Sequence, residues 1–254
     1  MNIRIDTHTH SVASGHAYST IDDLAKAARK RRLSGFVLTD HGPSMPGSTH
    51  PYHFSNLRIL PKKINGVFFF MGIEANIIDL EGNIDLGLTY LSRLDFVIAG
   101  LHEICFAPRS KEENTKAMAA ALANPLVDAV SHPGNTAFPI DIETVVQAAL
   151  QYGKALEINN SSFRVRPGCE ENCRAIARRC AETGTYLCCG SDAHYQDDVG
   201  NFTKAKQLLK EAGVREEFII NSSLENFRTF IGRRCRERRE TIKALQKKPD
   251  ITVN

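Results

Sequence analysis

Short runs of apolar and β-branched residues recur along this 254-residue chain, and a more polar stretch follows each run. Such runs are typical of buried strands. The polar stretches carry apolar residues at helical spacing, which predicts amphipathic helices. Seven strands are expected, at residues 3–6, 36–39, 67–73, 96–100, 129–131, 155–158 and 186–190. The helices expected between them include 21–31, 111–123, 142–152 and 170–183.

Alternating strands and helices predict an α/β fold whose parallel strands are joined by right-handed crossovers. One barrel suits the length better than two domains, because no change in composition marks a linker. We expect a hairpin at residues 77–86, and a long loop at 42–54. The sequence therefore predicts a distorted, TIM-like (β/α)7 barrel. A single domain would cover residues 1–254 and include a basic C-terminal helix or tail at about 228–254.

The composition is that of a globular protein, with 42% hydrophobic and 24% charged residues, which excludes disordered and collagen-like chains. No apolar run reaches the roughly 18 residues that a membrane span needs. The first ten residues also lack the apolar segment of a signal peptide. Seven cysteines are an odd number in a chain too long to need disulfides. We expect a cytoplasmic protein with free thiols and no membrane partner; its surface helices permit a homo-oligomer.

The net charge of +3 is unevenly distributed, because residues 228–248 contain nine Lys or Arg and two Glu. Such a run is usually a solvated helix face, and weak attraction to nucleic acid is the alternative. A nuclease needs a groove that follows several phosphates and aromatic side chains that stack on bases. Aromatic residues make up only 7% of this chain and Trp is absent. Nucleic acid is therefore the less favoured partner.

Side chains that bind metals follow six of the seven predicted strands. Asp6, His8 and His10 alternate along the first strand, so an extended backbone places them on one face. The C-terminal ends of parallel barrel strands share one rim, where active sites form. The candidate metal ligands at this rim are His8, His10, His16, His41, Glu74, His102, His132, Asp192 and His194.

Seven of the nine histidines belong to this rim set, more than satisfied core histidines explain. Imidazole and carboxylate ligands suit zinc, with manganese or iron as alternatives, whereas calcium and magnesium prefer oxygen ligands. Nine residues are too many for one tetrahedral ion and about enough for three if Glu74 bridges two. We expect Asp6 to accept a hydrogen bond from an imidazole; a simple loop cap is its alternative role.

Six motifs, in this order, resemble those of the polymerase and histidinol phosphatase (PHP) family. They are Asp6-x-His8-x-His10, Thr39-Asp40-His41, Gly72-Ile73-Glu74, Gly100-Leu101-His102, Ser131-His132-Pro133 and Gly190-Ser191-Asp192-Ala193-His194. Their spacing is most similar to that of the single-domain bacterial phosphatases of this family. The resemblance implies a distorted barrel of seven β/α units with a trinuclear zinc site.

The resemblance also implies how the ligands are shared among three zinc ions. The three sets are His8, His10, Glu74 and Asp192; Glu74, His102 and His132; and His16, His41 and His194. No ligand position is substituted, which favours an enzyme over a scaffold. Manganese or iron in some of the positions is the alternative to zinc.

We expect a metal-dependent phosphoric monoester hydrolase that acts on a small phosphorylated molecule. A metal-activated hydroxide would attack the phosphorus in line. Glu74, Asp192 and His194 are the expected catalytic residues, and Asp192 could relay a proton.

Three further residues are candidates for substrate binding. Arg164 and Arg166 follow the sixth strand, and arginine forms bidentate bonds to phosphate; surface charge is their alternative role. His53 lies in the 42–54 loop, where a solvent-facing side chain is the alternative to a substrate contact.

Three other functions remain open from the sequence. A phosphodiesterase or exonuclease that acts on nucleic-acid ends would use the same metal site. A non-catalytic scaffold would keep the fold without an open site. Amidohydrolase barrels also begin with a His-x-His motif, but they usually carry a bridging lysine where Glu74 stands here.

Overall fold

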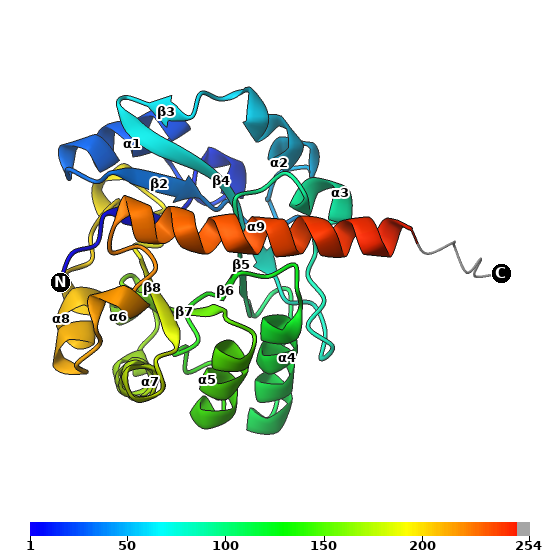
Figure 1. Ribbon diagram of the computed structural model, residues 1–254, viewed down its shortest axis with the longest axis vertical. Coiled ribbons are helices and arrows are strands. Elements are labelled where there is room, and N and C mark those ends of the chain that lie inside the picture. The colour runs from blue at the N-terminus through cyan, green and yellow to red at the C-terminus, as the bar shows by residue number, and fades with distance from the viewer. Residues whose placement is uncertain (248–254) are drawn as a thin grey trace.

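The computed structural model describes residues 1–247, in which parallel strands alternate with outer helices (Figure 1). The main sheet path is β1-β2-β4-β5-β6-β7-β8, and the short β3 pairs antiparallel with β4. The strands are β1 Ile5–Thr9, β2 Gly35–Leu38, β3 Lys63–Ile64, β4 Val67–Asn76, β5 Phe96–Gly100, β6 Ala129–Val130, β7 Ala155–Asn159 and β8 Tyr186–Gly190. This arrangement confirms the predicted α/β barrel of seven parallel strands; β3 was not predicted.

Helices follow most strands and cover the outside of the barrel. They are α1 Ile21–Lys30, α2 Tyr52–Asn56, α3 Leu88–Leu91, α4 Lys111–Ala123, α5 Ile142–Gln151, α6 Ser162–Val165, α7 Cys169–Thr183, α8 Thr203–Glu211 and α9 Leu224–Gln246. Short 3-10 turns are η1 Val12–Ser14, η2 Leu57–Ile59, η3 Gln196–Asp198 and η4 Glu216–Phe218. Capping boxes fix the starts of α1 (Thr20 with Asp23) and α4 (Ser110 with Glu113). The predicted 42–54 loop contains the start of α2.

The barrel is nearly closed, and a single asparagine spans the seam between β1 and β8. Asn221 is fully buried, and its Nδ2 donates to the carbonyl oxygens of Ile5 and Cys189, each at 2.8 Å. Its Oδ1 accepts from the Cys189 amide at 3.1 Å. Farther along, the Asp192 amide donates to the His8 carbonyl at 2.9 Å. These bonds satisfy edge groups that a β1–β8 ladder would otherwise pair.

Helix α9 closes the N-terminal end of the barrel and lies across the strands in Figure 1. Phe227, Phe230 and Ile231 pack into a cluster with inward-facing strand residues such as Ile98 and Ala155. A second, larger cluster fills the space between the strands and the outer helices. The ligand-type residues at the other ends of the strands are therefore held by a barrel packed on both sides.

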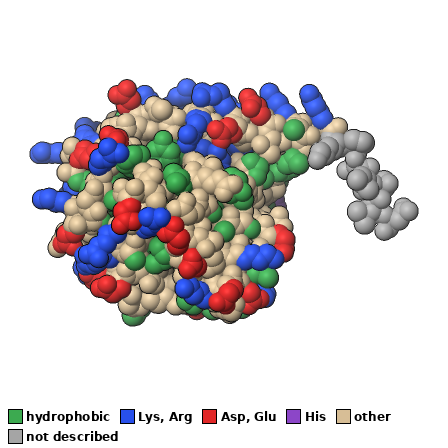
Figure 2. Space-filling view, turned by 60° about the horizontal axis from the view of Figure 1, so that its bottom comes forward, with side chains coloured by type: hydrophobic (Ala, Val, Ile, Leu, Met, Phe, Trp, Pro, Cys, Tyr) green, Lys and Arg blue, Asp and Glu red, His purple; other side chains and the backbone are tan. Residues whose placement is uncertain are grey.

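The basic helix that the sequence predicts is only partly a solvated face. Arg234 and Arg238 are buried and form ion pairs with the buried Asp128, directly before β6. Buried arginines need such partners, because an unpaired charge is costly there. In Figure 2, Lys and Arg side chains are interspersed with Asp and Glu over the face shown. Residues 248–254 of the predicted tail lie outside the described part. No helix within residues 1–247 is both long and apolar enough to cross a membrane.

Candidate metal centre

Glu74, on β4, lies at the centre of the histidine cluster and is almost completely buried. Its two oxygens face different imidazoles. Oε1 lies 2.9 Å from His132 Nε2 and 3.2 Å from His102 Nε2. Oε2 lies 2.9 Å from His41 Nδ1, 3.2 Å from His8 Nε2 and 3.5 Å from His10 Nε2. One carboxylate is thus placed to bridge two cation positions.

His8 and His10, on and just after β1, form a four-residue group with Glu74 and Asp192. Asp192 Oδ1 lies 3.5 Å from His8 Nε2 and 3.3 Å from His10 Nε2, which matches the Glu74 distances to the same atoms. Zinc bonds of about 2.0–2.2 Å place neighbouring tetrahedral ligand atoms roughly 3.3–3.6 Å apart. These four distances agree with a tetrahedral ion of that size, and the ligand atoms of His8, His10 and Glu74 all lie within 4.8 Å of one another.

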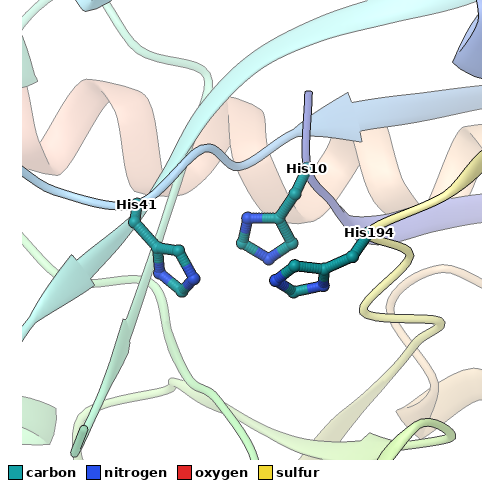
Figure 3. Close-up of side chains that lie close together, drawn as sticks. All are labelled: His10, His41 and His194. Carbon is teal, nitrogen blue, oxygen red and sulfur yellow. The ribbon is translucent and has the colours of Figure 1, made fainter. Parts of the chain in front are cut away.

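A second histidine group comes from three separate segments of the chain. The rings of His10, His41 and His194 point toward one another (Figure 3), with ligand nitrogens within 4.8 Å. His16 lies outside this triplet, but its ring centroid is 4.9 Å from those of His41 and His194. The three side chains of the predicted third set, His16, His41 and His194, are thus neighbours at the exposed edge of the cluster.

Hydrogen bonds on the far side of the rings orient the imidazoles. His8 Nδ1 lies 2.8 Å from Glu157 Oε1, and His102 Nδ1 lies 2.7 Å from Asn76 Oδ1. Both oxygens accept, so each Nδ1 must donate. His10 Nδ1 donates to Ser14 Oγ at 3.0 Å, since the Ser14 hydroxyl itself donates to Asp40. In the neutral form of all three rings, which is the form that binds a metal ion, Nε2 is therefore the unprotonated atom, and it faces the carboxylates.

Several of these ring nitrogens have no hydrogen bond within residues 1–247. His8 Nε2, His10 Nε2 and His41 Nδ1 are buried and unpaired, although carboxylate oxygens lie close by. A nitrogen lone pair that faces a carboxylate is unfavourable unless a cation lies between them, and buried polar atoms without partners are rare. The residues therefore fit a metal centre.

The charge balance of the cluster points the same way. Burial alone would raise the pKa of Glu74, but the surrounding imidazoles, His8 foremost, hold it well below its usual range. Burial opposes a charge on His8, yet Glu157, Glu74 and Asp192 hold its pKa well above the usual value. Three buried carboxylates in contact with His8 thus create a strong demand for positive charge.

The backbone at two candidate ligands is in the left-handed region, which non-glycine residues seldom adopt. His132 has φ 33° and Asp192 has φ 55°. Such conformations cost free energy, persist only where surrounding structure imposes them, and gather at functional sites. The loops after β6 and β8 are therefore built to direct these two side chains into the cluster.

Glycines at two strand ends leave room for the cluster. A Cβ on Gly190 would lie 2.1 Å from Glu157 Oε1 and 2.6 Å from the Cβ of His8. A Cβ on Gly100 would lie 2.2 Å from Ser131 Oγ. Neither contact is sterically allowed, so a side chain at either position would displace the residues that hold the imidazoles.

The three predicted substrate-binding residues have different positions. Arg166 reaches the cluster: its Nη1 lies 3.3 Å from Asp192 Oδ2, and its side chain is mostly buried. Arg164 is largely exposed and pairs with Asp198 at 2.8 Å, away from the histidines. His53 Nε2 lies 3.0 Å from Asp40 Oδ2, so it joins the cluster only through the Asp40–Ser14 network.

The role expected for Asp6 is wrong. Its carboxylate accepts from the backbone amides of His8, Ser191 and Gly200, at 3.3, 3.1 and 2.8 Å, and bonds to no imidazole within the described residues. Burial raises its pKa to about 6. Asp6 thus fixes the loop after β8 to β1, which agrees with its alternative role as a loop cap.

Sequence reasoning missed the residues that orient the rings. Glu157 is the most important, since it binds His8 through Oε1 and accepts from the His132 amide through Oε2 at 2.9 Å. It lies on β7, the one predicted strand to which no ligand was assigned. The alternation of Glu157 and Asn159 along that strand was a signal, because period two places both side chains on the face of the cluster.

The barrel and its rim of histidines and carboxylates define a family of proteins. Residues 6–161 match the family model described as PHP domain, so the chain belongs to the PHP family, as predicted. A protein of Acetivibrio thermocellus named "probable phosphatase" is 48% identical over 234 residues, which cover 92% of this chain and 97% of the relative. Another "probable phosphatase", from Aeromonas salmonicida, is 48% identical over 237 residues, covering 93% and 96%.

A solved structure shares the fold. The histidinol phosphate phosphatase of Lactococcus lactis, solved with zinc, L-histidinol and phosphate, matches with a TM-score of 0.61 at 20% identity. The match covers 84% of this chain and 94% of that one. It confirms the predicted fold class of the barrel.

Proposed function

We propose that this protein is a metal-dependent phosphatase that hydrolyses phosphomonoesters of small molecules at a trinuclear zinc site. The observation that carries the proposal is the buried Glu74, whose two oxygens face five imidazoles at 2.9–3.5 Å. The names of the relatives from Acetivibrio thermocellus and Aeromonas salmonicida support a phosphatase. The zinc and phosphate in the Lactococcus lactis structure agree with the metal and with the kind of substrate.

The zinc ions would be held by the three ligand sets expected from the sequence, with Glu74 shared between two of them. Imidazoles and carboxylates together suit zinc, and manganese or iron could replace it in some positions. Bound zinc would acidify a water molecule and stabilise the negative charge on the phosphoryl oxygens.

The side chains around the cluster have separate tasks in this proposal. Glu74 holds five imidazoles in one arrangement. Arg166, which is mostly buried beside Asp192, binds a phosphoryl oxygen through its guanidinium. Burial would raise the pKa of Asp192, but His8 and His10 hold it well below its usual range, so its carboxylate is ionised and suited to bind a metal ion. His194, whose side chain is 31% exposed, would contact an incoming phosphate from the outer side of the cluster.

The main alternative, a phosphodiesterase acting on nucleic-acid ends, has less support. The basic helix α9 contacts the segments that precede strands: Arg234 binds the Val127 carbonyl and Arg238 binds the Leu94 carbonyl. These segments lie at the N-terminal end of the barrel, whereas the cluster lies at the C-terminal end. The basic helix therefore does not lead phosphates toward the site.

We also infer a cytoplasmic location, which the unpaired cysteines support.

Purified protein tests this proposal directly. Metal content would be measured by mass spectrometry, and hydrolysis of p-nitrophenyl phosphate would be compared with that of bis-p-nitrophenyl phosphate, with and without a chelator. We expect bound zinc and a chelator-sensitive preference for the monoester. Preference for the diester would favour the nuclease, and zinc-loaded protein inactive on both esters would overturn the proposal.

A further inference from the structure

A cavity of about 460 Å³ opens directly beside the candidate metal centre. Two of the candidate ligands, His102 and His132, line it, and so does Arg166. Its size is within the usual range for small-molecule sites. If these three side chains hold the phosphoryl group of a phosphomonoester, the alcohol part of the ester would therefore lie in this cavity.

Two aliphatic side chains form part of the wall of this cavity. Ile104, after β5, is 66% exposed, and Val165, at the end of α6, is 53% exposed. Single exposed aliphatic residues are common on soluble proteins and need no explanation. These two come from segments far apart in the sequence, yet they line the same cavity as the candidate ligands, where Phe138 adds a buried aromatic ring.

Half of the residues that line the cavity are polar or charged. Glu103, Asn135 and Thr136 supply hydrogen-bonding atoms beside the apolar wall. The wall thus combines apolar side chains with hydrogen-bonding groups, and small-molecule sites commonly contain both. An alcohol with an apolar frame gains from packing on Ile104 and Val165, whereas a polyol has little apolar area to bury there.

A neighbouring cavity of about 500 Å³ is a weaker candidate for this role. It is lined by Asn160, Arg164, Asp198 and Lys204, among others, and none of the described candidate ligands lines it. Arg164 is already paired there with Asp198. An ester bound in this cavity would not present its phosphoryl group to the histidine cluster.

We propose that the cavity beside His102 and His132 binds the leaving group of the substrate, and that Ile104 and Val165 select phosphomonoesters of alcohols with a compact apolar frame. This inference rests on the proposed phosphatase function and adds the substrate class to it. The phosphoryl group lies against Arg166 and the metal centre, and the apolar part of the alcohol packs against the two aliphatic side chains.

The test uses the zinc-loaded full chain and two primary alkyl esters, 2-phenylethyl phosphate and glycerol 3-phosphate. We compare wild type with the double variant Ile104→Ser, Val165→Ser and with the control Ile59→Ser. Ile59 is 70% exposed, but it lies in η2, and its neighbours Arg58 and Leu60 line another cavity, against α9. Binding of the non-hydrolysable 3-phenylpropylphosphonate is measured by calorimetry on the same proteins.

Wild type should prefer the phenylethyl ester. Because each lost methylene contact changes selectivity by about 10-fold or more, the double variant should lose about 10- to 100-fold in kcat/KM for that ester. For glycerol 3-phosphate it should stay within about threefold of wild type, since that ester has little apolar area to bury. Zinc content should be unchanged, and Ile59→Ser should behave as wild type.

Equal losses on both esters, or no loss on either, would overturn the inference, and so would a wild-type preference for glycerol 3-phosphate. Hydrolysis of p-nitrophenyl phosphate but of neither alkyl ester would overturn the inference and leave the phosphatase proposal intact. If wild type hydrolysed none of the three esters, the phosphatase proposal would fail by itself. Binding of the phosphonate would then test whether the cavity holds the leaving group. Weaker binding to the double variant but not to Ile59→Ser would support that role of the cavity. Equal binding to all three proteins would refute it.

Discussion

His8 Nδ1 and Glu157 Oε1 lie 2.8 Å apart, and both side chains are fully buried. The contact joins β1 to β7, two strands that β8 separates, so it crosses the seam of the barrel. Because a carboxylate accepts, it fixes the proton of His8 on Nδ1 and leaves Nε2 free to bind a metal. Glu157 also accepts from the His132 amide, so one side chain positions members of two proposed ligand sets.

Replacing Glu157 with Gln should weaken zinc binding with little loss of fold. The amide keeps the size of the side chain but removes a buried negative charge that faces His8. Loss of such an outer partner typically costs about 10- to 100-fold in metal affinity. Competition with a chromophoric chelator measures the affinity, and Glu171→Gln, at an exposed position of α7, is the matched control. Unchanged affinity in Glu157→Gln would show that the contact is structural only.

Glu74→Gln should remove activity and more than one metal ion together. A bridging carboxylate serves two positions, so its loss affects both, whereas loss of His102 affects one. We expect kcat/KM to fall by at least about 100-fold in Glu74→Gln, because metal ions carry the charge of the transition state. Metal content by mass spectrometry should fall further in Glu74→Gln than in His102→Ala.

The control for these two variants is His50→Ala. His50 is exposed and only accepts a bond from the Tyr52 amide, so its replacement should change neither metal content nor activity. If Glu74→Gln retained its full metal content, the bridging role would be refuted.

Asn221→Ala should destabilise the barrel at its seam. The substitution removes three hydrogen bonds and leaves the Ile5 and Cys189 backbone groups buried without this partner. Each unpaired buried group costs about 1–3 kcal/mol. Because the surrounding structure relaxes in part, we expect the free energy of unfolding to fall by roughly 2–4 kcal/mol in total. Urea unfolding of the metal-free protein measures the change, and Gln151→Ala, at an exposed position of α5, should change stability by less than about 0.5 kcal/mol. A similarly small effect of Asn221→Ala would mean that other contacts hold the seam.

Lys154 should make stability depend on pH between about 7 and 10. Burial is the main cause that lowers its pKa from 10.5 to about 7, and the nearby Arg234 adds to this effect. Between these values the unfolded chain holds a proton that the folded chain has released, so the free energy of unfolding rises with pH across the window. Below about pH 7 Lys154 is protonated in both the folded and the unfolded chain, so burial of its charge lowers the free energy of unfolding by the full amount.

The measurement for Lys154 is urea unfolding at several pH values, for wild type and Lys154→Met. Other groups titrate in the same range, so the informative quantity is the difference between the two proteins. Wild type should gain stability relative to Lys154→Met as the pH rises from about 7 to about 10. A difference that does not change with pH would mean that Lys154 is charged in the folded state.

The elements that sequence predicted well are those with local physical causes. Short apolar runs located β5 and β8 with their observed ends, and the more polar stretch after β5 located α4, because such signals depend on only a few neighbouring positions. The two-residue β3 was missed because so short a segment carries no strong pattern. Helix α8 was missed although its buried residues Ala205, Leu208 and Leu209 recur at helical spacing. The 42–54 loop was predicted from its Pro and Gly content, but it contains the start of the one-turn helix α2.

Sequence by itself determined which residues gather at the rim, because parallel strands deliver their C-terminal ends to one place and His, Glu and Asp follow those ends. Only the tertiary structure decided which groups orient them. Glu157 meets His8 across 149 positions of sequence, and Asn221 bridges strands that lie at opposite ends of the sheet path. Asp6 alternates with His8 and His10 in sequence, yet it binds backbone amides of the loop after β8. Hydrogen bonds between distant segments depend on where the barrel places each backbone group. The pattern of neighbouring residues in the sequence therefore does not predict them.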